Sequence, residues 1–119
     1  WSFMKTEAEL EELWEDIPRE TDLLITHGPP AGILDSAYDR PPRRSTEEQE
    51  PPPGEPTRNV GSTALRQALN RVRPKVHLFG HIHESYGEST ENGIRHVNAS
   101  TVNRQYEPVR DPVVLELHA

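Results

Sequence analysis

The sequence contains no cysteine. This excludes disulfide bonds, thiolate zinc sites, iron–sulfur clusters and a cysteine nucleophile, so imidazole nitrogens and oxygen atoms are the metal ligands that the chain can offer. Hydrophobic residues are also scarce, at 32% of the 119 residues, whereas proline occurs 12 times. The apolar content suffices for a modest core and argues for one domain rather than two.

Long hydrophobic runs are absent too, since no stretch of about 18 apolar residues occurs that would cross a bilayer. The first residues lack the apolar core of a signal peptide, although the chain opens on Trp1 and an upstream segment is expected. We therefore expect a cytoplasmic protein with no membrane partner. The net charge of −7, from 20 acidic and 13 basic residues, disfavours a nucleic-acid polymer as a partner.

Two segments have the spacing of amphipathic helices. Residues 6–9 have the form of a capping box, and the apolar period that follows ends at Pro18, which predicts a helix with one buried stripe. A second helix is predicted after residues 61–62 and ends at residues 73–74. The apolar positions are Leu10, Leu13, Trp14 and Ile17 in the first helix, and Leu65, Ala68, Leu69 and Val72 in the second.

Four short apolar runs predict strands, at residues 23–26, 75–80, 94–99 and 113–117. The first run does not alternate, which favours a strand covered on both faces. The order of helices and strands predicts an α/β fold whose late part is antiparallel. Residues 38–58 are rich in Pro, Glu, Arg and Gln and have no apolar period, so we expect a flexible insertion there.

Two of the predicted strands end at histidines. His27 follows the first strand, and His81 and His83 follow the second in the order Gly-His-x-His. Sheets present ligands at the carboxyl ends of their strands, and imidazole is the commonest neutral metal ligand. The sequence therefore predicts that His27, His81 and His83 are metal ligands.

The other three histidines lack this setting. His77 lies inside an apolar run, where a hydrogen-bonded core histidine is the expected role, and we assign structural roles to His96 and His118 as well. Residues 98–100 match a glycosylation sequon, but they follow a predicted strand in a chain without a secretory signal. We interpret them as a polar turn at the end of that strand.

Two motifs carry a family resemblance. The sequence Thr-His-Gly-Pro-Pro at residues 26–30, with Phe-Gly-His-Ile-His at residues 79–83, resembles the last two metal-ligand motifs of the calcineurin-like metallophosphoesterases. Four further segments resemble the metallophosphoesterase-domain-containing subgroup of this family. That subgroup is itself similar to class III cyclic-nucleotide phosphodiesterases. The agreeing segments are residues 24–26, 73–75, 82–84 and 98–101. The resemblance implies that residues 1–119 form the carboxyl-terminal half of such a domain, the later half of a four-layer α/β/β/α sandwich, with 38–58 as an insertion.

The resemblance also implies a hydrolase with two divalent metal ions, each Mn, Fe, Co or Zn. His27 and His81 would bind one ion and His83 the other, and water would attack the phosphorus of a phosphodiester or phosphomonoester in line. Cyclic nucleotides belong to the implied phosphate-ester substrates. The family's early motifs, Asp-x-His, Gly-Asp-x-x-Asp and Gly-Asn-His-Asp/Glu, do not occur in these residues. We therefore expect no catalytic residues here beyond the metal ligands, and no competent enzyme without the upstream motifs.

Two other functions agree with the same residues. A catalytically inactive homologue would act as a binding module through residues 38–58, and a mononuclear metal binder would use the histidines without hydrolysis. The oligomeric state stays open.

Overall fold

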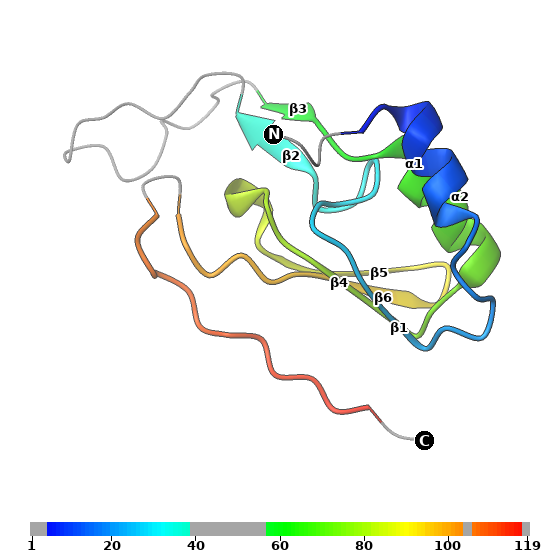
Figure 1. Cartoon of the computed structure of the whole chain (residues 1–119). Coiled ribbons are helices and arrows are strands. Elements are labelled where there is room, and N and C mark those ends of the chain that lie inside the picture. Colours follow the sequence, from blue (N-terminus) through cyan, green and yellow to red (C-terminus); the bar gives the residue numbers. More distant parts are fainter. Residues whose placement is uncertain (1–4, 39–56, 104–105, 118–119) are drawn as a thin grey trace.

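The computed structural model describes residues 5–38, 57–103 and 106–117. These residues form two α-helices that lie side by side next to a four-stranded sheet of order β1-β4-β6-β5 (Figure 1). Strands β1, β4 and β6 run parallel, and β5 is antiparallel to β6. The elements are α1 (Glu7–Trp14), β1 (Leu23–Ile25), β2 (Ser36–Tyr38), β3 (Thr57–Asn59), α2 (Thr63–Val72), β4 (Val76–Phe79), the 3-10 turn η1 (His83–Ser85), β5 (Gly87–Glu91) and β6 (Ile94–Asn98). The predicted α/β class is confirmed, with a mixed sheet.

Helix α1 begins at the predicted capping box. The Thr6 hydroxyl accepts from the Glu9 amide, and the Glu9 carboxylate accepts from the Thr6 amide. The helix ends at Trp14, and none of its residues is fully buried; Leu13 is 46% exposed. The predicted buried stripe is only partly covered, because α1 packs beside α2 rather than into the sheet (Figure 1).

Helix α2 supplies the core, as its apolar period predicts. Ser62 caps its first turn, and Arg73 ends it in a left-handed conformation before Pro74. Leu65 and Leu69 pack against Ile94 of β6, with Trp14 and Leu24 beside them. Neither helix of the described residues has the length and apolarity to cross a membrane.

Two strand predictions are wrong. Strand β1 was expected to be covered on both faces, yet Ile25 is 68% exposed, because none of the described residues packs over its side chain. Strand β1 is also the edge strand of the sheet and pairs with β4 alone among the described strands. Residues 113–117 form no strand, because they run past the side of the sheet away from the helices rather than within it (Figure 1). The late part is antiparallel as predicted, but the partner of β6 is β5, a strand that the sequence did not predict; the two are joined by a turn with positive φ at Asn92 and Gly93.

Strands β2 and β3 form a second, two-stranded sheet that the sequence did not predict. They contain the described ends of the predicted insertion; its remainder, residues 39–56, lies outside the described residues. The Tyr38 amide donates to the Glu84 carboxylate (3.1 Å), and the Ser85 hydroxyl donates to the Ser36 carbonyl (2.7 Å). The first end of the insertion is therefore held beside η1, and the second end is joined to it by the pairing of β3 with β2.

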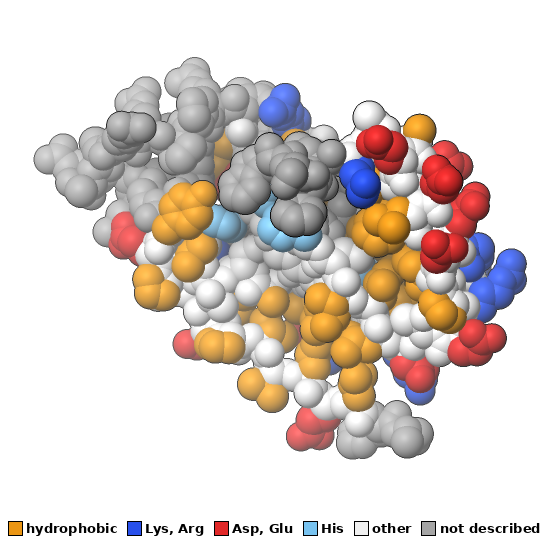
Figure 2. Space-filling model, viewed as in Figure 1, with side chains coloured by type: hydrophobic (Ala, Val, Ile, Leu, Met, Phe, Trp, Pro, Cys, Tyr) orange, Lys and Arg blue, Asp and Glu red, His pale blue; other side chains and the backbone are white. Residues whose placement is uncertain are grey.

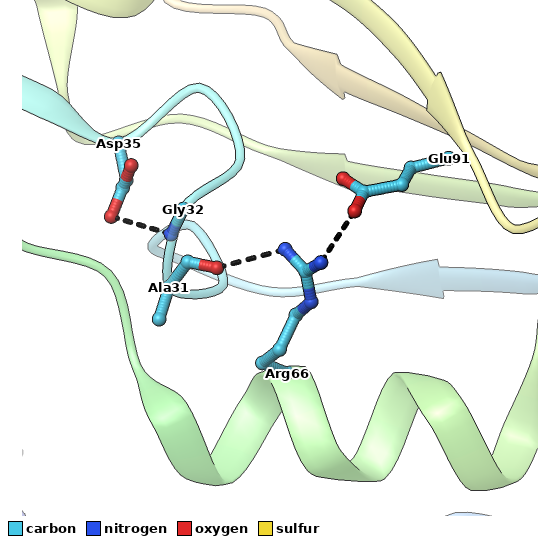
Figure 3. A network of polar contacts seen from close by, with 5 residues as sticks. All are labelled: Ala31, Gly32, Asp35, Arg66 and Glu91. Carbon is cyan, nitrogen blue, oxygen red and sulfur yellow. Dashed lines mark hydrogen bonds and ion pairs between the residues drawn. The ribbon is translucent and has the colours of Figure 1, made fainter.

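The loop after β1 is anchored to the start of α2 by backbone hydrogen bonds. The Ala31 amide donates to the Ser62 carbonyl (2.9 Å), and the Ser62 amide donates to the Pro29 carbonyl (3.0 Å). The buried Asp35 carboxylate accepts from the Gly32 and Gly61 amides, both at 2.9 Å. Figure 3 shows the Asp35–Gly32 bond, together with Arg66, which links the Ala31 carbonyl to Glu91.

This anchor predicts that Gly61→Ala destabilises the chain. A Cβ atom at Gly61 would lie 2.3 Å from the Pro30 carbonyl oxygen, whereas one at Gly28 would contact nothing within 4 Å. We expect Gly61→Ala to lower the free energy of unfolding by about 3 kcal/mol, and Gly28→Ala to change it by less than about 0.5 kcal/mol. Urea denaturation measures both, and equal stabilities would contradict the close approach.

Candidate metal centre

Strand pairing brings His27 and His81 together. Strands β1 and β4 are parallel, with Ile25 opposite Leu78, so the residues that follow them meet at one edge of the sheet. The Gly80 amide donates to the His27 carbonyl (3.0 Å), which holds the two loops together. As a result, the two imidazoles form a hydrogen bond between His27 Nε2 and His81 Nδ1 (3.1 Å), with ring centroids 4.6 Å apart.

Both imidazoles of this pair are exposed. Figure 2 shows histidine side chains reaching the surface of the molecule. Partial burial lowers the pKa of His81, positive charge on His27 or His83 would lower it further, and Glu84 opposes this. The lowered pKa favours the neutral imidazole, which is the form that binds metals.

The separation of the two ring nitrogens fits one transition ion. Metal–imidazole bonds of about 2.1 Å place two nitrogens on the same ion about 3.0 to 3.4 Å apart at tetrahedral or octahedral angles. The His27–His81 separation of 3.1 Å falls in this interval. Two neutral nitrogen donors at an open edge also suit Mn, Fe, Co or Zn, so the pair fits part of a metal site.

The backbone at His81 is strained. Its φ is 69°, a left-handed value that non-glycine residues rarely adopt, and the Ile82 amide donates to the Gly80 carbonyl (2.8 Å) across it. A hydrogen bond from residue i+2 to residue i, with positive φ at the central residue, is the rare γ-turn. Strain of this kind is concentrated at functional sites, where it aims a side chain.

His83 lies apart from the pair. It begins η1, is partly buried, and its Nδ1 donates to the Asn103 carbonyl (3.0 Å), while its ring and that of Tyr106 are nearly perpendicular, with centroids 5.2 Å apart. This contact leaves Nε2 as the free acceptor nitrogen. Among the residues that the structure describes, no three His, Cys, Asp or Glu side chains are grouped closely enough to hold a metal ion. The structure thus brings together two of the three predicted ligands, and the role of all three stays a prediction.

Asn98 holds the loop between His81 and His83, a role that its sequence position did not reveal. Its side chain is fully buried at the end of β6, donates to the Ile82 carbonyl (2.9 Å) and accepts from the Ser100 amide and hydroxyl. The interpretation of residues 98–100 as a polar turn is confirmed. A polar residue that ends a buried strand was the available signal, but its partner lies 16 residues away.

His77 and His96 are core residues, as predicted. His77 is fully buried, with Nε2 2.9 Å from the Thr26 hydroxyl and Nδ1 3.2 Å from His96 Nδ1. Burial, helped by the neighbouring His96, lowers the pKa of His77 to about 3, and burial also lowers the pKa of His96. The prediction for His118 falls outside the described residues.

Comparison with known proteins gives the family. No family model matches the chain. Metallophosphoesterase domain-containing protein 1 of Homo sapiens is 37% identical over 119 residues, which is 98% of this chain, and the protein of that name from Mus musculus gives the same values. The chain belongs to the metallophosphoesterase domain-containing family. A UPF0046 protein of Caenorhabditis elegans is 30% identical over 113 residues, or 94% of the chain. The chain spans about a third of these relatives, 32% of the mammalian proteins and 33% of the worm protein.

The strain at His81 predicts a difference between two substitutions that both remove its imidazole. Glycine adopts positive φ freely, whereas alanine keeps the strain. We therefore expect His81→Gly to be more stable than His81→Ala by about 1 kcal/mol. Chemical denaturation of the two variants measures the difference, and an alanine variant as stable as the glycine variant would show that residue 81 carries no strain.

The lowered pKa of His77 predicts acid sensitivity. Between its ordinary pKa of 6.5 and about 3, this imidazole is protonated in the unfolded chain and neutral in the folded chain. The unfolded state then binds the additional proton, so the free energy of unfolding falls as pH decreases through this range, by up to about 1.4 kcal/mol per pH unit. Urea denaturation at several pH values should show a shallower pH dependence for His77→Leu, and an unchanged slope would refute the assignment.

Proposed function

We propose that this chain supplies imidazole ligands to the metal centre of a phosphoesterase. The observation that supports this best is the pair of exposed ring nitrogens, His27 Nε2 and His81 Nδ1, 3.1 Å apart beyond the ends of two parallel strands. The family name of the mammalian relatives agrees with a hydrolase that uses metal ions. The proposed substrates are phosphodiesters or phosphomonoesters, with cyclic nucleotides among them.

The residues divide into ligands and supports. His27 and His81 would hold one divalent ion, and His83 would offer Nε2 to a second, because its Nδ1 is engaged by the Asn103 carbonyl. When bound, such ions neutralise the phosphoryl oxygens and activate water for attack on phosphorus. The chain itself lowers the pKa of His81, which favours its neutral form, and fixes the loop of residues 81–83 through Asn98.

The oxygen ligands of the proposed dinuclear centre must come from chain outside these 119 residues. The motifs that would supply a bridging carboxylate and an asparagine ligand do not occur in the sequence. In this proposal the sheet β1-β4-β6-β5 is one layer of a calcineurin-like four-layer sandwich. Further strands of the domain would pair with the edge strand β1.

A mononuclear metal binder is the second candidate function. The pairing of His27 with His81, apart from His83, favours it, because two imidazoles with water can hold a single transition ion without the missing carboxylates. In this case metal would bind without phosphoester hydrolysis.

Replacing the matching residues of the human relative with this chain tests the first proposal. We expect Mn-dependent hydrolysis of bis(p-nitrophenyl) phosphate by the chimera, measured beside the unaltered relative, and a loss of at least about 100-fold with His27→Ala or His81→Ala. Thr90→Ala, an exposed position on β5, is the control and should leave the rate unchanged. Hydrolysis that survives the histidine substitutions would contradict the proposed ligands.

A further inference from the structure

A chain of side-chain hydrogen bonds runs from the core to the loop of His27. The Thr26 hydroxyl has one proton and donates it to the Gly28 carbonyl (2.8 Å), so it must accept from His77 Nε2 (2.9 Å). His77 Nδ1 is then unprotonated and accepts from His96 Nδ1 (3.2 Å). Since each group carries one proton, the direction is fixed: His96 donates to His77, His77 to Thr26, and Thr26 to Gly28.

These two imidazoles occupy sites where apolar side chains would be the simpler choice. His77 and His96 are 0% and 1% exposed, and they lie opposite each other in the β4–β6 pairing. Burying two polar rings costs free energy, and their hydrogen bonds do no more than offset that cost. The two histidines therefore give the folded chain no more stability than leucine or phenylalanine would at the same positions. The last acceptor in this series of hydrogen bonds is the Gly28 carbonyl, which belongs to the residue that follows His27.

The peptide groups around His27 are therefore fixed on both sides. The Gly80 amide donates to the His27 carbonyl (3.0 Å), and the Thr26 hydroxyl holds the Gly28 carbonyl. The next residue, Pro29, is buried. The His27 ring is exposed and hydrogen-bonded to His81, and these two backbone bonds fix the part of the main chain from which the ring projects.

We infer that His77 and His96 are positioning residues for the candidate metal centre, acting on His27 through Thr26. This inference rests on the proposed function, because it assigns the buried pair a role in the affinity of the same site. Neither imidazole would touch the metal. The lowered pKa values of His77 and His96 agree with this role. A neutral His77 keeps Nδ1 unprotonated, so that it can accept the hydrogen bond from His96.

Thr26→Val and Thr26→Ser test the link between the core and the loop. Valine keeps the β-branched shape but removes the hydroxyl, whereas serine retains the hydroxyl. In titrations of the whole chain with Co(II), followed by visible absorption, we expect valine to weaken binding 10- to 100-fold and serine to leave it within about threefold of the parent. His77→Leu should weaken binding as valine does, and His77→Gln, whose amide can donate in place of Nε2, should restore part of the loss.

If His77 and Thr26 serve only the stability of the fold, the expected results differ. In that case Thr26→Val and His77→Leu would lower the melting temperature, while Co(II) affinity and the absorption spectrum would match the parent. That result would overturn the inference. A double variant, Thr26→Val with His77→Leu, should bind no more weakly than either single variant, because both break the same chain of bonds.

A metal-free measurement separates this inference from the proposed function. Nuclear magnetic resonance of the apo chain reports the His27 ring shifts and the exchange of the Gly80 amide with solvent. If the parent binds no Co(II), the proposed function fails, yet altered ring shifts and faster exchange in Thr26→Val, absent in Thr26→Ser, would still support positioning. Unchanged signals in Thr26→Val would overturn the inference.

Discussion

The parallel pairing of β1 with β4 is the constraint on which the candidate centre depends. It places the residues after both strands at one edge, so the Gly80 amide meets the His27 carbonyl and the two exposed imidazoles come within 3.1 Å. A register shift of one residue would reverse the faces of every side chain on β1 and move Thr26 away from His77. The geometry of the site is thus a property of the sheet rather than of the loops alone.

Hydrogen bonds from three directions hold the loops at this edge. The start of α2 holds residues 29–31 through Ser62, Asn98 holds the Ile82 carbonyl, and the His96–His77–Thr26 chain holds Gly28. Most of these acceptors are backbone carbonyls, so the supports leave the imidazoles of His27 and His81 exposed. A site arranged in this way is rigid in its backbone and open to a ligand, as binding of a metal ion with fixed ligand geometry requires.

Local signals in the sequence predicted the helices and the strand ends, and non-local pairing limited the rest. The capping box at Thr6 and the apolar period of α2 depend on residues three or four apart, so they could be identified directly. The strand predicted at 113–117 was wrong because an apolar run forms a strand only where a partner edge accepts it. No local pattern in the sequence predicts the pairing of β4 with β6. The contact between His77 and His96 and the role of Asn98 both follow from that pairing, so they could not be predicted.

In the proposed metal centre, the imidazoles of His27 and His81 bind the same ion. X-ray absorption at the metal edge of the Co(II)-loaded chain tests it most directly, because the outer atoms of each imidazole ring scatter in a pattern that counts histidine ligands. We expect scattering from at least two imidazoles, with one fewer in His27→Ala and in His81→Ala. A bound ion without imidazole scattering, or a count that neither substitution changes, would contradict it.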